Sequence, residues 1–373
     1  MSRLSFAGLP QVPGCAVAGI ALVLALGAGT SPALAQGCIA SRGSGLTTCQ
    51  MGSHHDLDMA AGPSSGFEAS VAYRWLHSDR MFSYDAEQKQ READGSQEIN
   101  DSHFIDIGVR YNFNPRYSAT LTLPLSTQER SEVVRRRNLA RTILARFDTH
   151  SSGLGDLRLE GNAWLLDPQK HMNGNVQLGL GVSAPSGDRN VQDNFLVPVG
   201  TTARLISVSH AVDQSIQLGN GGWGLILDLY AYQQIVPRLN AFVNGSYTVT
   251  PEEKYSPSGV SPYSIADSYL GRSGLEWTMW PKHGLRLSVA GRVEGVPVHD
   301  LVGGSDGFRR PGYAVSFEPG ISADYKSWSF ALSAPVALYR NREQSVAEQA
   351  AGSAPVAAGF ADFVILCSVT KKF

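Results

Sequence analysis

The chain has 373 residues and a formal net charge of −2; 17 % of its residues are charged and 39 are glycine. So small a net charge creates no basic field that would attract nucleic acid, and we exclude nucleic acid as a partner. No run of eighteen apolar residues follows residue 35, which excludes a helical membrane protein. The mean hydropathy of −0.12 is typical of a soluble protein, but a β-barrel conceals its apolar face by alternation and reaches the same average.

Residues 1–35 have the organisation of a secretory signal peptide. Arg3 supplies a positive start, residues 15–26 form an apolar core, and residues 33–35 (Ala-Leu-Ala) are a small-x-small cleavage pattern. Cleavage there makes Gln36 the mature N-terminus. The alternative is a lipid anchor on Cys38, but Gln36 is a poor match to the residue that precedes glycine in that motif. We therefore predict export without lipidation.

Residues 36–65 are polar and rich in glycine and serine, which predicts a periplasmic tail or a small plug. Cys38 and Cys49 reach the oxidising periplasm close together in sequence, so we predict a disulfide between them. Closing so short a loop contributes about 3 kcal/mol at most. The neighbouring His54 and His55 cannot easily share one tetrahedral ion, and we predict neither a metal site nor a cofactor.

Twelve segments beyond residue 65 alternate between apolar and polar residues with the period of a β-strand. In the first segment, Phe67, Val71 and Trp75 share one face, whereas Glu68 and Arg74 share the other. The twelve segments are residues 67–75, 105–113, 117–125, 157–165, 176–184, 223–231, 239–249, 269–279, 285–293, 313–321, 328–338 and 361–373. We predict an all-β protein in which each strand has one apolar face.

The connections between these segments alternate between short and long. The links after the even-numbered strands are tight, at residues 114–116, 167–174, 235–238, 281–284 and 326–327, and the links after the odd-numbered strands are long and polar. This pattern, with an even strand number, predicts a closed antiparallel up-and-down transmembrane β-barrel over residues 66–373 with short periplasmic turns and long external loops. The third external loop, residues 185–222, either adds a hairpin that makes fourteen strands or folds into the lumen; Pro198 interrupts it, and we keep twelve.

The last strand ends the chain on an aromatic residue. Phe363, Ile365, Cys367, Val369 and Phe373 lie on its apolar face, and Cys367 is predicted to be a lipid-facing thiol. A final strand that ends on phenylalanine resembles the closing strand of bacterial outer-membrane β-barrels. That resemblance implies recognition by the barrel-assembly machinery through the strand ending at Phe373.

Three motifs at strand–loop junctions carry a second resemblance. Residues 153–156 (Gly-Leu-Gly-Asp), 184–188 (Ala-Pro-Ser-Gly-Asp) and 217–224 (Gln-Leu-Gly-Asn-Gly-Gly-Trp-Gly) resemble those of outer-membrane transporters linked to phenol degradation, the MetA-pathway type. Residues 300–313 are similar to related proteobacterial proteins. The resemblance covers the chain from about Gly153 onward and implies a transport function. It identifies no binding residues, because its motifs lie where loops join strands.

The polar face of the strands supplies the candidate lumen. Twelve strands enclose an interior of intermediate width: side chains fill the interior of an eight-stranded barrel, whereas sixteen or more strands leave a wide channel. The charged residues predicted to line it are Arg74, Arg110, Arg158, Glu160, Arg272, Glu276, Arg286, Arg292, Glu294 and Glu318. Both signs occur, so ion pairs that stiffen or plug the barrel are as consistent with the pattern as a path for solute. The aromatic residues Phe104, Trp164, Tyr230, Tyr232 and Phe242 share this face.

Our leading hypothesis is a non-enzymatic channel or transporter for small solutes, including aromatic or hydrophobic ones, in contact with outer-membrane lipid and lipopolysaccharide. An outer-membrane lipid hydrolase is the second hypothesis, with Ser102 and His103 as the nucleophile and base. The third is a closed structural or surface-binding barrel, whose second external loop would bring arginines to lipopolysaccharide phosphates: Arg135, Arg136, Arg137, Arg141 and Arg146.

Overall fold

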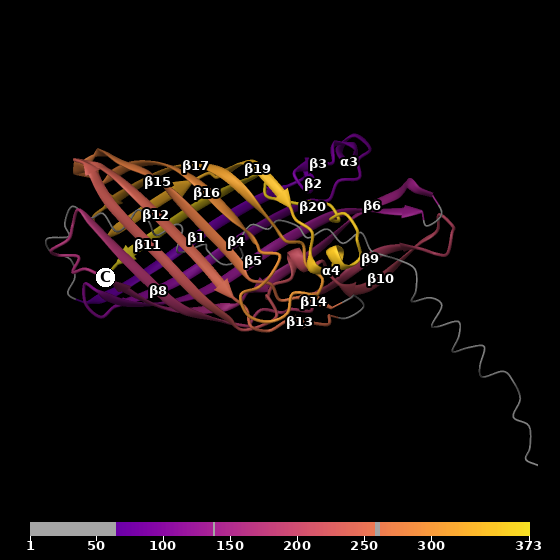
Figure 1. Ribbon diagram of the computed structural model, residues 1–373, viewed down its shortest axis with the longest axis horizontal. Helices are drawn as coiled ribbons and strands as arrows, with labels where there is room; N and C mark the ends of the chain where they lie inside the picture. The colour runs from indigo at the N-terminus through magenta and orange to yellow at the C-terminus, as the bar shows by residue number, and fades with distance from the viewer. Residues whose placement is uncertain (1–64, 137–138, 258–261) are drawn as a thin grey trace, which may run out of the picture. The chain divides into compact units, whose positions relative to one another are not determined.

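The computed structural model describes residues 65–136, 139–257 and 262–373. Their strands form one large antiparallel sheet whose first and last members, β1 and β21, pair with each other, so that the sheet closes into a barrel (Figure 1). The sheet contains fourteen strands. Of these, β6 and β7 are successive parts of one wall strand, and β18 and β19 are successive parts of another, so the barrel has the twelve wall strands that the sequence predicted. The predicted signal peptide, the tail before residue 65 and the disulfide between Cys38 and Cys49 lie outside the described residues.

The wall strands follow one another around the barrel in chain order. They are β1 (Gly66–Ser78), β4 (Ile99–Asn112), β5 (Tyr117–Arg136), β6 (Leu139–Leu154), β7 (Leu157–Trp164), β8 (Gly174–Ala184), β11 (Gly224–Val236), β12 (Leu239–Val249), β15 (Ser268–Trp280), β16 (Leu285–Val296), β17 (Gly312–Tyr325), β18 (Trp328–Ser333), β19 (Val336–Arg342) and β21 (Phe363–Lys372). Ala334 and Pro335 separate β18 from β19, because proline cannot donate to the ladder. The register of β1 against β21 runs from Glu68↔Lys372 to His77↔Phe363.

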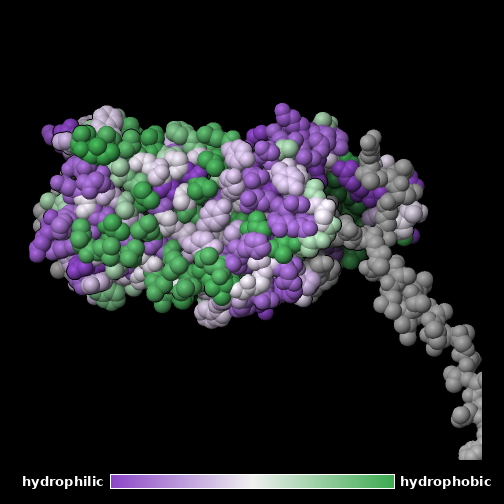
Figure 2. Space-filling model, in the orientation of Figure 1, coloured by the Kyte–Doolittle hydropathy of each residue, from purple (hydrophilic) through white to green (hydrophobic). Residues whose placement is uncertain are grey.

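Alternation sends the apolar side chains outward. Leu159 is more than half exposed, whereas its two neighbours on the same strand, Arg158 and Glu160, are buried. On the face seen in Figure 2, hydrophobic patches lie over the strands and hydrophilic residues predominate over the loops near β2, β3 and α3. An exposed apolar surface of this extent is unfavourable in water and stable against lipid tails. Within the described residues, no helix is long and apolar enough to cross a bilayer.

The five connections at one end of the barrel are short: residues 113–116, 165–173, 237–238, 281–284 and 326–327. The turn between β15 and β16 contains a 3-10 helix, η4 (Pro281–His283), and ends at Gly284 with a φ of 55°. A Cβ there would stand 2.9 Å from the Cβ of Asp324, so the turn needs glycine. Following the rule for outer-membrane barrels, we take this end as periplasmic.

The long connections gather at the opposite end (Figure 1). The first contains β2 (Met81–Ser83), β3 (Ala86–Glu87) and α3 (Lys89–Ala93), and the third contains β9 (Gln192–Pro198), β10 (Leu205–Ala211) and the 3-10 helix η3 (Gln214–Ile216). The fourth contains β13 (Lys254–Tyr255) and β14 (Tyr263–Ser264), and the last contains α4 (Val346–Ala350) and β20 (Ala358–Gly359). These elements build an outer cap on the barrel.

Two of these connections differ from the expected loops. The second, predicted to be a polar loop from residue 126 to 156, is a hairpin in which β5 and β6 continue as paired strands from Leu125↔Leu154 to Arg136↔Leu139. Pairing between β5 and β6 satisfies the backbone groups of this largely polar segment. In the third, β9 and β10 pair only with each other in a two-stranded sheet, so they add nothing to the wall. The residues that follow β10 turn inward.

Candidate functional site in the barrel lumen

All ten charged residues predicted from the sequence lie on the inward-facing parity of their strands and are buried. Eight charged side chains stand midway along the wall strands, and we call them the charged belt: Arg74, Asp106, Arg158, Asp228, Arg272, Arg292, Glu294 and Glu318. Asp106 and Asp228 were not among the predicted site residues, although the same alternation places them on the inward face.

Ion pairs join the members of the belt that come from β15, β16 and β17. Arg272 lies 3.0 Å from Glu318, whose second oxygen is 3.5 Å from Arg292. Arg292 also binds Glu294 at 2.9 Å. On the other side of the lumen, the charge of Arg74 interacts with Asp106 and, across the barrel, with Glu294. The belt therefore spans the lumen, and its charges compensate one another.

The remaining predicted charges form two smaller groups. Arg286 binds Asp324 at 2.6 Å and lies 3.8 Å from Glu276. Arg110 of β4 interacts with Glu160 of β7, and Glu160 also interacts with Asp228 and Arg158 of the belt. The ten predicted residues thus form neighbouring groups that charge interactions connect.

Four of the five predicted lumen aromatics form one aromatic cluster in the periplasmic half of the lumen. Trp164, Tyr230, Tyr232 and Phe242 are all buried and pack together with Ala290. The Trp164 ring meets both tyrosine rings edge to face at centroid distances of 6.0 and 5.9 Å, and the guanidinium of Arg272 lies 5.4 Å from the Phe242 ring.

Phe104 stands apart from this cluster. It packs against an apolar lumen surface that is made by Ala72 and Leu76 of β1, Val364 and Leu366 of β21, and Ala361, which precedes β21. The guanidinium of Arg74 lies over its ring at 4.4 Å. The lumen therefore has two apolar surfaces on different walls, and an arginine of the belt contacts each.

The three sequence motifs at strand–loop junctions meet at Asp156, between β6 and β7. Its Oδ1 accepts a hydrogen bond from the amide of Gly187 at 3.0 Å, and its Oδ2 accepts one from Asn220 at 2.6 Å. Gly187 and Gly219 are in backbone contact, and a Cβ on Gly219 would stand 2.5 Å from the Gly187 carbonyl oxygen. We call this arrangement the clasp. It fastens both ends of the third external connection at its base, a long-range contact that the motifs themselves did not reveal.

Between β10 and the clasp, residues 211–217 turn into the outer mouth of the barrel, and we call them the inner segment. Val212, Ile216 and Gln217 are each at most 1 % exposed. Gln128 of β5 donates to the Ile216 carbonyl at 3.5 Å, and Tyr263 donates to the Val212 carbonyl at 3.1 Å. The sequence left open an inward fold of residues 195–199 and 204–208. Those residues lie in the separate β9–β10 hairpin, and residues 211–217 turn inward instead.

An ion pair anchors the middle of the inner segment. Oδ2 of Asp213 lies 3.5 Å from Nη1 of Arg310, and both side chains are buried. Burial alone would raise the pKa of Asp213, but Arg130, Arg310 and hydrogen bonds from Ser215 hold this pKa below the usual carboxyl value. Burial lowers the pKa of Arg310 to about 9, so its guanidinium stays charged at neutral pH.

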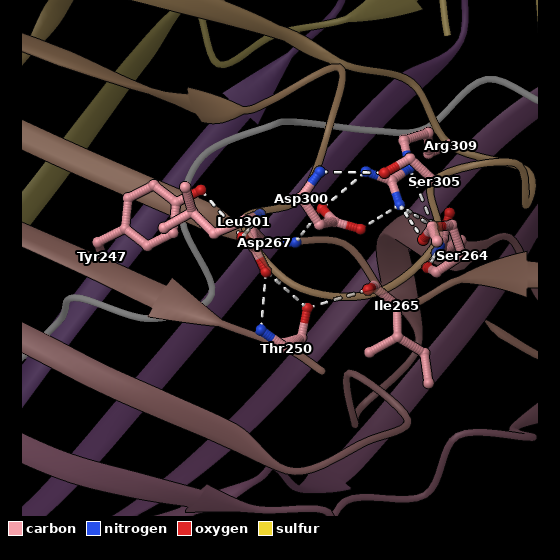
Figure 3. A network of polar contacts seen from close by, with 11 residues as sticks. Tyr247, Thr250, Ser264, Ile265, Asp267, Asp300, Leu301, Ser305 and Arg309 are labelled. Atoms are coloured by element: carbon pink, nitrogen blue, oxygen red, sulfur yellow. Dashed lines mark hydrogen bonds and ion pairs between the residues drawn. The ribbon is translucent and has the colours of Figure 1, made fainter. Parts of the chain in front are cut away.

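The loops around Arg310 are held by the polar network in Figure 3. The carboxylate of Asp267 accepts hydrogen bonds from Tyr247, Thr250 and the amide of Leu301. Asp300 accepts a hydrogen bond from Arg309 at 2.7 Å, and Arg309 also donates to Ser264 at 3.0 Å. Tyr263 and Arg310, the sequence neighbours of Ser264 and Arg309, are fixed as a consequence.

The lipid-hydrolase residues lie on opposite faces of β4. Ser102 is 3 % exposed and points inward, whereas His103 points outward and its Nδ1 lies 2.7 Å from the Tyr73 hydroxyl. Successive residues of a strand face opposite sides, so this serine and histidine cannot act as a nucleophile and its base. The hypothesis of a Ser102–His103 hydrolase site is therefore wrong.

The other predicted surface chemistry is mainly structural. Arg136 donates to the Thr201 carbonyl, and Arg146 donates to the carbonyls of Gly95 and Gln97, so two of the arginines of the second external connection brace neighbouring loops. Among the described residues, no group of three or more His, Cys, Asp or Glu side chains is arranged to hold a metal ion. Cys367 is a free thiol.

No protein-family model matches this sequence, and no curated protein matches it either. The crystal structure of the COG4313 outer membrane channel from Pseudomonas putida F1 aligns with a TM-score of 0.55 and 12 % identity, covering 83 % of this chain and 96 % of that one. At so low an identity this similarity shows the fold alone, which is that of an outer-membrane β-barrel.

Two further solved structures align less well. The toluene transporter TodX from P. putida gives a TM-score of 0.42 at 9 % identity, covering 84 % of this chain and 92 % of that one. The translocator domain of the autotransporter NalP from Neisseria meningitidis gives 0.43 at 11 % identity, covering 85 % and 91 %. The closed barrel with its apolar outer face, together with the shared fold, places the protein in the bacterial outer membrane.

Proposed function

We propose that this outer-membrane β-barrel is a channel for small organic solutes, with aromatic compounds as the preferred class. Phenol and its relatives, which the sequence resemblance implies, belong to that class. The observation that carries the proposal is the aromatic cluster of Trp164, Tyr230, Tyr232 and Phe242, which is buried inside the lumen rather than placed against lipid. Such rings offer faces and edges on which a planar solute stacks.

The charged belt is compatible with the passage of solutes that carry no large charge. Its arginines and carboxylates compensate one another, so the belt exerts little net repulsion on either sign. On β5, Thr120 and Thr122 face inward, but charged residues stand beside both: Thr120 pairs with Arg110 and Glu160, and Thr122 pairs with Arg158. A solute that passes the belt therefore meets charges that compensate one another.

The lumen in this structure has the features of a closed state. Its lining side chains are almost fully buried, and the inner segment occupies the outer mouth. Passage of a solute requires the inner segment or its neighbouring loops to move, which is the usual behaviour of channels gated by loops. The proposed channel is thus a gated one.

Reconstitution tests the proposal directly. Purified protein in planar bilayers should conduct ions above background, and in liposomes it should admit benzyl alcohol faster than a sugar of similar size. Replacing Trp164 and Phe242 by leucine should lower benzyl alcohol flux about two- to tenfold, the effect of losing one or two ring contacts, while leaving ion conductance close to normal. The matched control is Trp277→Leu, because Trp277 is 48 % exposed on the outer face of β15.

The competing candidate is a closed barrel that stiffens the membrane or presents its loops. The buried ion pairs of the lumen favour it, since charges that satisfy one another need no solute. A correctly folded barrel that never conducts above background, under any applied potential, would establish this candidate in place of the channel.

We further propose two partners from the outer surface. Phe373 is 70 % exposed at the end of β21 and suits recognition by the barrel-assembly machinery, as the resemblance of the last strand implies. The apolar outer face suits contact with outer-membrane lipid, and the external loops suit contact with lipopolysaccharide. Deleting Phe373 should reduce the amount of assembled barrel without changing the conductance of the barrels that do assemble.

A further inference from the structure

We infer that Arg310 and Arg130 form a recognition site for the carboxylate of a small aromatic acid, and that Asp213 occupies this site until such a ligand displaces it. The inference rests on the proposed channel function and assigns to it a substrate class and a trigger for opening. Displacement of Asp213 frees the inner segment, which otherwise fills the outer mouth.

The three side chains come together from distant parts of the chain. Arg130 lies on the inward face of β5, Arg310 precedes β17, and Asp213 is in the connection between β10 and β11. Both arginines are essentially unexposed. Arg310 lies 3.5 Å from the Asp213 carboxylate, and the charge of Arg130 also acts on it. Arg310 pairs with this carboxylate directly, whereas the guanidinium of Arg130 contacts Glu98 and Glu132 and adds only its charge. A buried guanidinium with a second positive charge nearby is a suitable setting for an organic anion.

The arginines are held in place by contacts that do not involve Asp213. Arg130 binds Glu98 at 2.6 Å and Asn100 at 3.3 Å. Arg310 lies over the Phe308 ring at 4.8 Å and follows Arg309, which Asp300 fixes. The site therefore persists when Asp213 leaves, as recognition of an external ligand requires.

Aromatic rings lie on one side of this pair of arginines: Phe308 stacks on Arg310, and Tyr263 interacts with the charges of both arginines. The ring of Tyr263, which is fully buried, lies 6.1 Å from that of Phe308 and 5.7 Å from that of Tyr255. A carboxylate attached directly to an aromatic ring can bind the guanidiniums while its ring packs among these three side chains. The site thus selects benzoate-like acids over both simple carboxylates and uncharged arenes.

Exchange of one carboxylate for another explains why a ligand would release the segment. Leaving a buried arginine without an anion is costly, so spontaneous departure of Asp213 is disfavoured. When a ligand carboxylate takes its place, the ion pair is retained. The other contacts of the segment carry no full charges. They are the buried side chains of Val212 and Ile216 and hydrogen bonds that involve Gln128, Gln214, Tyr263 and Val191.

Calorimetric titration of the purified full-length protein with sodium benzoate tests this inference. Asp213→Asn removes the internal occupant and keeps the side-chain shape, so its Kd for benzoate should be at least about tenfold lower than that of the unaltered protein. Arg310→Gln should abolish binding. The matched control is Asp306→Asn, which removes an exposed carboxylate from the same loop region and should leave the Kd unchanged.

Acetate has the carboxylate of the proposed ligand without its ring, and benzyl alcohol has the ring without the charge. Each should bind to Asp213→Asn at least tenfold more weakly than benzoate does. The inference is overturned if Asp213→Asn binds benzoate no more tightly than Asp306→Asn does, or if benzyl alcohol binds as well as benzoate. These two results do not depend on whether Arg310→Gln folds. Bilayer recordings separate this inference from the proposed function. If benzoate binds but no variant conducts, the channel is refuted and the binding site stands. If the protein conducts but does not bind benzoate, the binding site is refuted and the channel stands.

Discussion

At the scale of single residues, Glu318 of β17 compensates buried positive charges from two other strands of the lumen. It is 1 % exposed and is the common partner of Arg272 and Arg292, which come from two neighbouring strands. Arg292 has Glu294 as a second acidic partner, but the two arginines share Glu318. Loss of its charge leaves two buried guanidiniums with too few anions, which is among the more costly changes a protein interior can undergo.

We therefore expect Glu318→Gln to lower the stability of the barrel by about 3 to 5 kcal/mol. The temperature at which the folded, fast-migrating form disappears on a semi-native gel measures this effect. Glu87→Gln is the control, since Glu87 pairs with the partly exposed Arg80 in an external loop and should cost about 1 kcal/mol or less. Equal midpoints for the two variants would contradict the assigned role of Glu318.

Asp213 provides a prediction about pH. Its native pKa lies below the 3.8 of an unperturbed aspartate, so the stabilisation it gives is complete above about pH 5 and is lost as the pH falls through the native value. Arg130, Arg310 and Ser215 act on this carboxylate and stabilise its charged form. Glu98 and Glu132 also lie near Arg130, and Tyr263 is close by.

Hydrogen–deuterium exchange, corrected for the intrinsic effect of pH, measures this loss. Peptides that contain the inner segment should exchange faster at pH 3 than at pH 6 in the unaltered protein. In Asp213→Asn they should exchange fast at both values, because no carboxylate remains to titrate. An unaltered protein whose inner segment is equally protected at both pH values would show that the ion pair does not hold it.

At the scale of elements, the third external connection consists of three parts with separate roles. The β9–β10 hairpin stands outside the wall, the inner segment fills the mouth, and the clasp at Asp156 fastens both ends. The clasp explains why three separated motifs occur at strand–loop junctions: they meet in space. Because it holds the base of the connection, the inner segment can move without unfolding the wall strands on either side.

Replacing residues 211–217 with a glycine–serine linker of equal length should therefore raise the bilayer conductance several-fold and leave the barrel folded. The reason is that the linker has neither the buried apolar side chains nor the ion pair that keep the segment in the mouth. A linker of the same composition at residues 199–203, the turn between β9 and β10, is the control. If both replacements give the conductance of the unaltered protein, the inner segment does not close the channel.

At the scale of the whole molecule, closure of the sheet positions everything else. The register of β1 against β21 and the twelve strands fix how wide the interior is, and hence that charges from β1 and β16 act on one another across it. The barrel also removes sheet edges that would otherwise pair with other chains. Each strand thus serves both as wall and as one side of the lumen.

The sequence by itself determined the strands, their number, the short turns and the inward parity of each predicted charge, because side-chain direction in a strand follows from a period of two and needs no tertiary information. It also placed Phe104 on the inward face of β4, where it packs against the lumen surface of β1 and β21. What it could not give was which inward residues meet. Arg272 and Glu318 lie on different strands, and Asp213 and Arg310 are separated by 97 residues.

Only the tertiary structure decided those pairs, and with them the clasp, the inner segment and the division of the lumen into a charged belt and two apolar surfaces. The physical reason is that loops have no repeating pattern: their paths are set by a few long-range ion pairs and hydrogen bonds, such as those of Asp156 and Asp213, whose partners a local alternation cannot identify.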